Sequence, residues 1–149
     1  MSTSGRPRWS VSATAFCAIA AGVAVPVAWL ATAAGYGIAT TEPVRDLAVI
    51  ALGSVAEEVV FRGALQPAIA RRIDAAARLG ITPANALTSV VFAALHLWRH
   101  PPVVALFVLP VSLVLGRASE LSGRVWPAAL LHLVFNGLLY AASWLHAAA

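Results

Sequence analysis

Charged residues are scarce in this sequence, and lysine is absent altogether. Asp, Glu, Lys and Arg make up 11% of the 149 residues and hydrophobic residues 60%, whereas soluble domains carry about 25% charged residues. A soluble chain with so few charges could not cover its surface with polar groups. The composition, with a mean hydropathy of +0.84, therefore predicts an integral membrane protein that has the lipid bilayer as a partner.

Cysteine is almost as rare as lysine. Cys17 is the one cysteine and lies in an apolar run, which excludes a disulfide or a cysteine-based metal site within this chain. A sequence pI near 10.6 is compatible with nucleic-acid binding. However, the ten arginines are scattered at the ends of apolar segments and form no basic stripe. We therefore expect no nucleic-acid partner.

Long apolar runs separated by short polar stretches predict an all-α fold, a polytopic transmembrane helical bundle that forms one domain over residues 1–149. Residues 1–46 hold a first span and a loop without motifs, and residues 47–145 hold the core that carries the motifs. We expect the first span to be retained, because its apolar run is longer than the roughly 7–15 residues of a secretory signal core.

We expect five spans in all, together with a short interfacial helix. The spans are Val11–Ala31, a second that begins near Leu47, Ala84–Trp98, Val103–Leu115 and Val125–Leu145. The interfacial helix is expected over Ala68–Leu79, and the polar loops over Thr40–Asp46 and Gly116–Arg124.

Arginine placement predicts the orientation, because positively charged loops stay on the cytoplasmic side. If the N-terminus is cytoplasmic, only Arg45 and Arg99 fall outside. The C-terminus then lies outside after five spans. The arginines on the cytoplasmic side are Arg6, Arg8, Arg71, Arg72, Arg78, Arg117 and Arg124.

Two adjacent carboxylates, Glu57 and Glu58, interrupt the second apolar run. Burying a carboxylate in hydrocarbon costs several kcal/mol unless it is paired, hydrated or put to use. Glu58 and Arg62 are four residues apart with the acid first, the favourable order for a helical ion pair. Glu57 lies about 100° further around the helix and gains no partner from its own segment, so it is the residue that needs a functional explanation.

Three further polar side chains, His96, His132 and Asn136, fall inside later apolar runs. Ionisable residues at membrane depth turn toward the interior of a bundle, so we expect all of them to meet Glu57 in one pocket. The depths match if the second helix continues past Pro67 to about Arg71.

Such a pocket supports hydrolysis by an activated water molecule. A desolvated Glu57 is a useful general base, a histidine opposite holds the same water, and N–H donors of His132 and Asn136 stabilise an oxyanion. No Ser/His/Asp set occurs at comparable depth. Ser54 and Ser112 are isolated, and we expect them to bond to the backbone of their own helices.

The residues Glu57-Glu58-x-x-x-Arg62, Phe92-x-x-x-His96 and His132-x-x-x-Asn136 resemble the three motifs of the CPBP family. This family comprises the CAAX-protease (Abi/CAAX-type) and bacteriocin-processing intramembrane glutamic endopeptidases. The motif order and the placement on successive apolar helices also match, from about Leu47 to Leu145.

The resemblance implies a role for each matched position. Glu57 would activate water, and His96 would be its second ligand. His132 and Asn136 would form the oxyanion side. Glu58 and Arg62, with Phe92, would support the site.

The chain is similar in its length to compact bacterial members rather than to the eukaryotic prenyl-protein members. The resemblance then implies a bacterial plasma (inner) membrane protein that uses no cofactor. Its substrate would be a membrane-anchored protein or peptide, such as one with a C-terminal hydrophobic sorting tail.

Two alternatives stay open from the residues alone. Glu57, His96 and His132 could be three ligands of a catalytic zinc ion, although the chain contains no His-Glu-x-x-His motif. A non-catalytic scaffold, an immunity protein or a proton-coupled transporter could use the same polar cluster, although the chain lacks the internal repeat typical of secondary transporters.

Overall fold

The structure, a computed structural model, describes residues 11–33, 43–73, 77 and 80–147, and these residues form helices joined by turns. The predicted all-α bundle is confirmed. In chain order the elements are α1 (Val11–Ala33), α2 (Pro43–Glu58), the π-helical segment η1 (Val59–Leu65), α3 (Gln66–Ala70), α4 (Pro83–His96), α5 (Pro102–Ser122) and α6 (Trp126–Ala147).

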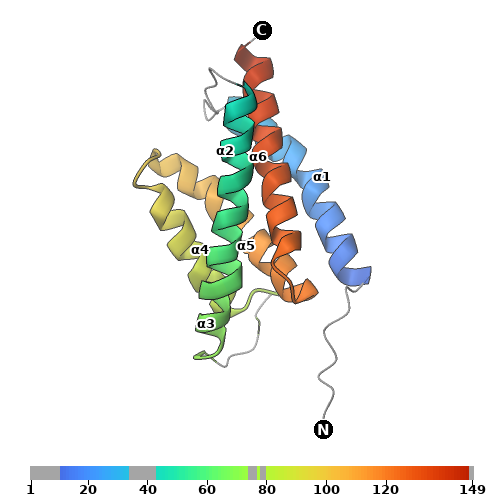
Figure 1. Cartoon of the computed structure of the whole chain (residues 1–149), viewed down its shortest axis with the longest axis vertical. Helices are drawn as coiled ribbons and strands as arrows, with labels where there is room; N and C mark the ends of the chain where they lie inside the picture. The colour runs from blue at the N-terminus through green and yellow to red at the C-terminus, as the bar shows by residue number, and fades with distance from the viewer. Residues whose placement is uncertain (1–10, 34–42, 74–76, 78–79, 148–149) are drawn as a thin grey trace.

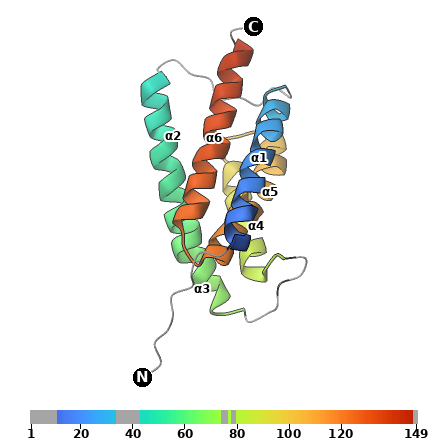
Figure 2. The same cartoon turned by 90° about the vertical axis from the view of Figure 1, so that its right-hand side faces the viewer.

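Helix α6 lies between α1 and α2 and also packs against α5, while α4 pairs mainly with α5 (Figures 1 and 2). The turn that joins α4 to α5 lies below the upper ends of α2 and α6 in both views. Helix α4 has 14 residues, which is a length of about 21 Å against a hydrocarbon core of about 30 Å. Helix α4, which ends at His96, is therefore shorter than an upright membrane span.

Three helices are long and apolar enough to cross a membrane, among the residues that the structure describes: Ser12–Ala33, Pro102–Ser122 and Trp126–His146. The first and last of these coincide with the predicted first and fifth spans. The predicted second and third spans correspond to the α2–η1–α3 run and to the shorter α4.

The second helix continues past Pro67, as the sequence analysis required for Glu57 to lie at the same membrane depth as His96. Its helical run is unbroken from Pro43 through Pro67 to Ala70. A proline inside a helix removes one donor and crowds the carbonyl four residues earlier. Here the π-helical turns of η1 end just before Pro67, and the Gln66 N–H bonds to the Phe61 carbonyl, five residues back. This wider winding carries the chain past the proline without ending the helix.

Three predicted boundaries are wrong within the described residues. Residues 43–46 of the loop expected over Thr40–Asp46 form the first turn of α2, which begins at Pro43 rather than near Leu47. The loop expected over Gly116–Arg124 is mostly helix, because α5 continues to Ser122 and ends at Gly123, whose φ of 63° is the left-handed conformation that glycine adopts readily. The interfacial helix expected over Ala68–Leu79 stops at Ala70, and the following residues Arg71–Ile73 and Ala77 are not helical. Residues 74–76 and 78–79 of that prediction, and residues 40–42 of the predicted first loop, lie outside the described residues.

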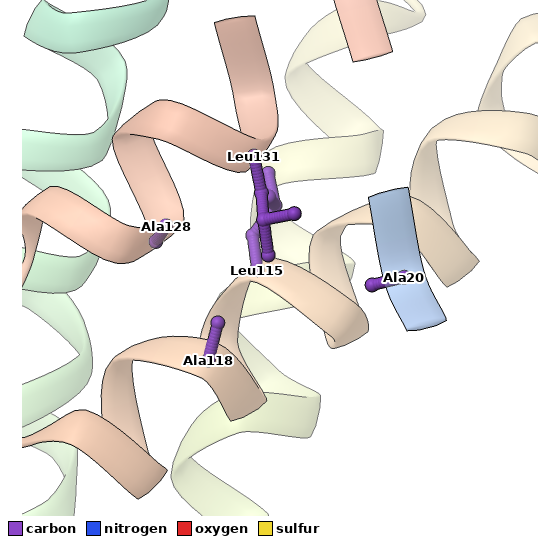
Figure 3. Close-up of a cluster of buried hydrophobic side chains, with 5 residues drawn as sticks. All are labelled: Ala20, Leu115, Ala118, Ala128 and Leu131. Atoms are coloured by element: carbon purple, nitrogen blue, oxygen red, sulfur yellow. The ribbon is translucent and has the colours of Figure 1, made fainter. Parts of the chain in front are cut away.

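The apolar core lies where α1, α5 and α6 meet (Figure 3). It is formed mainly by small side chains around two leucines, and such residues let helix backbones approach closely inside a membrane. The buried cluster consists of Ala20, Leu115, Ala118, Ala128 and Leu131. This contact joins α1 to the bundle and holds α6 in place, with its polar residues turned toward α2.

Candidate active site

His132 on α6 lies between the two adjacent glutamates of α2. Its Nδ1 is 2.9 Å from Glu58 Oε1, and its Nε2 is 3.8 Å from Glu57 Oε2. A carboxylate only accepts hydrogen bonds, so Nδ1 carries the proton and donates it to Glu58. In the neutral imidazole, Nε2 is then the unprotonated nitrogen and faces Glu57.

The two glutamates lie in different environments. The Glu58 side chain is fully buried, whereas 42% of the Glu57 side chain is exposed. The sequence led us to expect a desolvated Glu57, and this expectation is wrong: the desolvated carboxylate is Glu58, because successive helical positions point about 100° apart. Glu57 instead lines an open cavity.

Arg62, in η1, provides the counter-charge for Glu58. Its Nε is 3.3 Å from Glu58 Oε2, close enough for an ion pair although the groups are not aligned for a hydrogen bond. Its Nη2 donates to the Ser112 Oγ at 2.6 Å and to the Ser112 carbonyl at 2.8 Å. The guanidinium carbon lies 5.0 Å from the centre of the Phe92 ring, within the range of a cation–π contact. The predicted ion pair is therefore present and is fixed by α5 and α4 as well.

Phe92 on α4 is the buried aromatic ring around which the site is packed. Its ring centre is 4.7 Å from that of His96, 6.0 Å from that of His132 and 4.8 Å from that of Phe61. His96 Nδ1 lies 2.9 Å from the Phe92 carbonyl. A carbonyl only accepts, so Nδ1 donates and leaves Nε2 of His96 unprotonated in the neutral ring. Both histidines thus have the same proton arrangement.

Asn136 lies one turn beyond His132 on α6, and its Nδ2 donates to the Ser54 Oγ at 2.9 Å. The expectation that Ser54 and Ser112 bond only to their own helices is wrong, because each accepts a hydrogen bond from a side chain of the site. Each donor lies on a neighbouring segment, and the sequence of one helix does not show how it is rotated relative to its neighbours.

A cavity of about 230 Å³ brings the predicted polar residues together. Its other walls are apolar and come from α5, α6 and α1. The polar residues that line it are Glu57, His96, His100, His132 and Asn136, and the aromatic residues are Phe92, Phe107 and Phe135.

A second cavity, of about 400 Å³, shares Glu57, Phe92, His96 and His100 with the first. It opens beside Phe61 of η1, on the side where α2 faces α4. The two cavities meet at Glu57 and His96, so these side chains can be reached from two directions.

Sequence reasoning missed two contributions to the cavity. His100 was not among the residues expected in the pocket, yet its ring is stacked on His96 with the centres 6.0 Å apart, and it lines the cavity. Helix α1 carries no motif, yet Val27 and Ala31 form part of the apolar wall. The position of His100, one helical turn after His96, was a usable signal. Nothing in the α1 sequence distinguishes Val27 from its neighbours.

As a metal centre, the arrangement lacks a complete ligand set. No group of three His, Cys, Asp or Glu side chains in the described part of the chain is placed to hold a metal ion.

Fold and site together define an α-helical membrane protein with carboxylates, imidazoles and an amide around an interior cavity. The family model described as type II CAAX prenyl endopeptidase Rce1-like matches residues 39–138. The chain belongs to this family of membrane proteases, and the resemblance inferred from the three motifs is confirmed. No curated protein and no solved structure matches the chain. The matched residues run from before α2 into α6 and exclude α1.

Proposed function

We propose that this protein is an intramembrane endopeptidase that hydrolyses a peptide bond of a membrane-associated protein or peptide through a water molecule activated by Glu57. The observation that carries the proposal is the alignment of Glu58, His132 and Glu57 at the cavity, with the His132 Nε2 3.8 Å from Glu57. Membership of a protease family supports the reaction class.

Glu57 is the general base of the proposed reaction. A water molecule held by the Glu57 carboxylate and by an unprotonated Nε2 of His132 or His96 keeps a lone pair for the substrate carbonyl carbon. As the water oxygen attacks, its proton passes to Glu57. The same proton then moves from Glu57 to the leaving nitrogen, so that the C–N bond breaks and a carboxylic acid and an amine are released.

Glu58 and Arg62 support this chemistry without touching the substrate. The Glu58 carboxylate fixes the tautomer and ring orientation of His132, and it stabilises the imidazolium form if the ring takes up a proton. Arg62 neutralises Glu58 inside the bundle. A buried carboxylate without this partner would have to leave the site or become protonated.

The negative oxygen of the tetrahedral intermediate needs hydrogen-bond donors. Asn136 uses one Nδ2 hydrogen on Ser54, and its second hydrogen remains for the substrate. In this proposal the neutral His132 holds water, and it donates to the oxyanion only in its protonated form.

We place the protein in a bacterial plasma membrane with the N-terminus in the cytoplasm. Arg71, Arg72 and Arg124 follow α3 and α5 at the end of the bundle where α1 begins, and Arg45 lies at the other end (Figure 1). Arginine-rich ends stay in the cytoplasm. The proposed substrate is a membrane-anchored peptide, for example one with a C-terminal hydrophobic tail, and reporter fusions to each terminus would test the orientation.

The test of the mechanism is Glu57→Gln. Co-expression with a panel of membrane-anchored peptides should give a cleavage product for the wild type, and the substitution should lower its rate by about 10²–10⁴-fold, the usual contribution of a general base. The thermal unfolding temperature should be unchanged, because the Glu57 side chain is 42% exposed. Asp46→Asn, a matched carboxylate-to-amide change near the start of α2, should leave cleavage intact. Cleavage by Glu57→Gln at the wild-type rate would refute the role of Glu57.

Metal independence is part of the proposal. Cleavage by protein purified with strong chelators should proceed at the wild-type rate, because the reaction relies on Glu57 rather than on a metal-bound water. A rate that falls on chelation and returns with zinc would establish the alternative metallopeptidase.

A further inference from the structure

Two buried polar atoms near the ion pair lack partners among the described residues. They are Arg62 Nη1 and Gln66 Oε1. Arg62 is 2% exposed and Gln66 is 5% exposed. A buried polar atom without a hydrogen bond costs about 1–3 kcal/mol, so such atoms call for an explanation.

Arg62 and Gln66 both line a cavity that the proposed active site does not use. It has a volume of about 380 Å³, and we call it the rear chamber. Ser119, Glu120 and Arg124 line it from the α5 side. The rear chamber lies at the end of the bundle that holds α3, beyond Arg62, whereas the active-site cavity extends the other way along α6 as far as Leu139.

The hydrogen-bonding groups that line the rear chamber indicate which kind of molecule can occupy it. Gln66 Nε2 donates to Glu120 Oε1 at 3.0 Å, which leaves Oε1 of Gln66 as an acceptor. Arg62 Nη1 is a donor only. A ligand that serves both atoms must accept from Arg62 and donate to Gln66. Water does both, whereas a fully ionised phosphate or carboxylate could not donate to Gln66.

Charge also favours water over an anion. The Arg62 charge is balanced by Glu58 at 3.3 Å. Glu120 and Arg124 also line the rear chamber, so its wall carries one further carboxylate and one further guanidinium and no excess of positive charge that would call for an anion. The volume is far above the roughly 10–15 Å³ that one water molecule needs.

We propose that the rear chamber is a water-filled inlet that hydrates Arg62 and Gln66 from the end of the bundle opposite to the active-site cavity. Water there completes the hydrogen bonds of the Arg62 guanidinium and so lets it stay buried beside Glu58 as its counter-charge. Solvent and substrate then approach the site from opposite directions, separated by the ion pair. This inference does not depend on the proposed peptidase activity.

Thiol accessibility tests the proposal without an activity assay. In a Cys17→Ser background, Gln66→Cys places a thiol inside the rear chamber, where Gln66 is 5% exposed, and Ala118→Cys places one in the apolar core, where Ala118 is 0% exposed. A charged methanethiosulfonate reagent reacts only where water admits it. In lipid nanodiscs, Gln66→Cys should react at least about tenfold faster than Ala118→Cys, since reaction requires an exposed thiolate.

Two results of this experiment would overturn the inference. Equal, slow reaction at both positions would mean that the chamber is dry. Protection of Gln66→Cys by millimolar inorganic phosphate, but not by chloride at the same ionic strength, would mean that an anion rather than water occupies it.

A second pair of variants covers the case in which Gln66→Cys does not fold. Ser119→Leu would fill the rear chamber, and Ser119→Ala removes the same hydroxyl without filling it. If water occupies the chamber, Ser119→Leu displaces it from Arg62 and should unfold at a lower temperature than Ser119→Ala. If the chamber is dry, the added side chain gains apolar contacts and the order reverses, which would contradict the proposal.

Discussion

Helix α5 is buried on two faces of opposite chemistry. Toward α1 and α6 it presents Leu115 and Ala118, which pack in the apolar cluster. Toward η1 and α4 it presents Ser112 and Gly116, beside Arg62 and Asn85. Leu115, Ala118 and Ser112 are fully buried, and Gly116 is buried as well. The apolar face needs only the right volume, whereas the polar face needs each donor to meet an acceptor. The polar face therefore fixes how the helices are rotated relative to one another.

Among substitutions that affect the polar face of α5, we expect Arg62→Met to lower stability most. It leaves Glu58 buried without a counter-charge, which costs about 3–5 kcal/mol. Thermal or denaturant unfolding in detergent should show this loss. Arg117→Met is the matched control, because its ion pair with Glu120 is 33% and 19% exposed and such pairs contribute at most about 1 kcal/mol. Equal losses in the two variants would mean that burial does not set the strength of these pairs.

Substitutions on the apolar face of α5 should lower the stability of the protein without changing its cleavage rate. Leu115→Ala removes a fully buried side chain, and we expect a loss of about 2–3 kcal/mol, the low end for such changes, because the surrounding alanines can close in. Cleavage per folded molecule should be unchanged. Leu115→Met, which conserves volume, should cost less than about 1.5 kcal/mol. A large fall in catalytic rate with intact folding would show that the two faces are coupled.

The smallest expected loss of stability comes from removing one hydroxyl that bonds to a side chain of another helix. It is compared with the removal of a hydroxyl that bonds to the backbone of its own helix. Ser54→Ala removes the acceptor of Asn136 and should cost about 0.5–1.5 kcal/mol, together with a reduced cleavage rate, because the Asn136 amide is no longer oriented. Thr32→Val is the control, since the Thr32 hydroxyl bonds only to the backbone of α1 in the hydrogen bonds that the structure describes. A wild-type cleavage rate for Ser54→Ala would remove Asn136 from the proposed site.

The sequence predicted the helical class and the residues of the cavity, because both depend on patterns that lie along single helices. Charges inside apolar runs must turn inward, so Glu57, His96, His132 and Asn136 were expected to meet, and they line one cavity. Their common depth followed from helix length alone, once the second helix was taken through Pro67.

The sequence could not predict features that depend on how two helices face each other. Arg117 and Glu120 were predicted to lie in a polar loop because they are charged. They lie on α5, where Glu120 accepts hydrogen bonds from both Gln66 and Thr82. Gly116 read as a helix end, yet it is a point of close approach: a Cβ there would lie 1.9 Å from Asn85 Oδ1. The partners of Glu120 and Gly116 lie on α3, at the start of α4 and on α4, some thirty to sixty positions away in the chain, whereas the Arg117–Glu120 pair lies within α5.

The π-helical winding of η1 has a consequence for the phase of the whole acidic helix. Each residue of an α-helix advances about 100°, and wider turns advance less per residue, so they can take up one extra residue while the helix before them keeps its direction relative to the helix after them. With Gln66 still bonded to α5, winding all seven residues of η1 as a regular helix would turn the carboxylate of Glu57 away from His132. Deleting one residue between Val59 and Leu65 would let the segment wind as a regular helix and leave Glu57 pointing in nearly the same direction. The direction of the acidic pair thus depends on the number of residues in η1 and on their winding together.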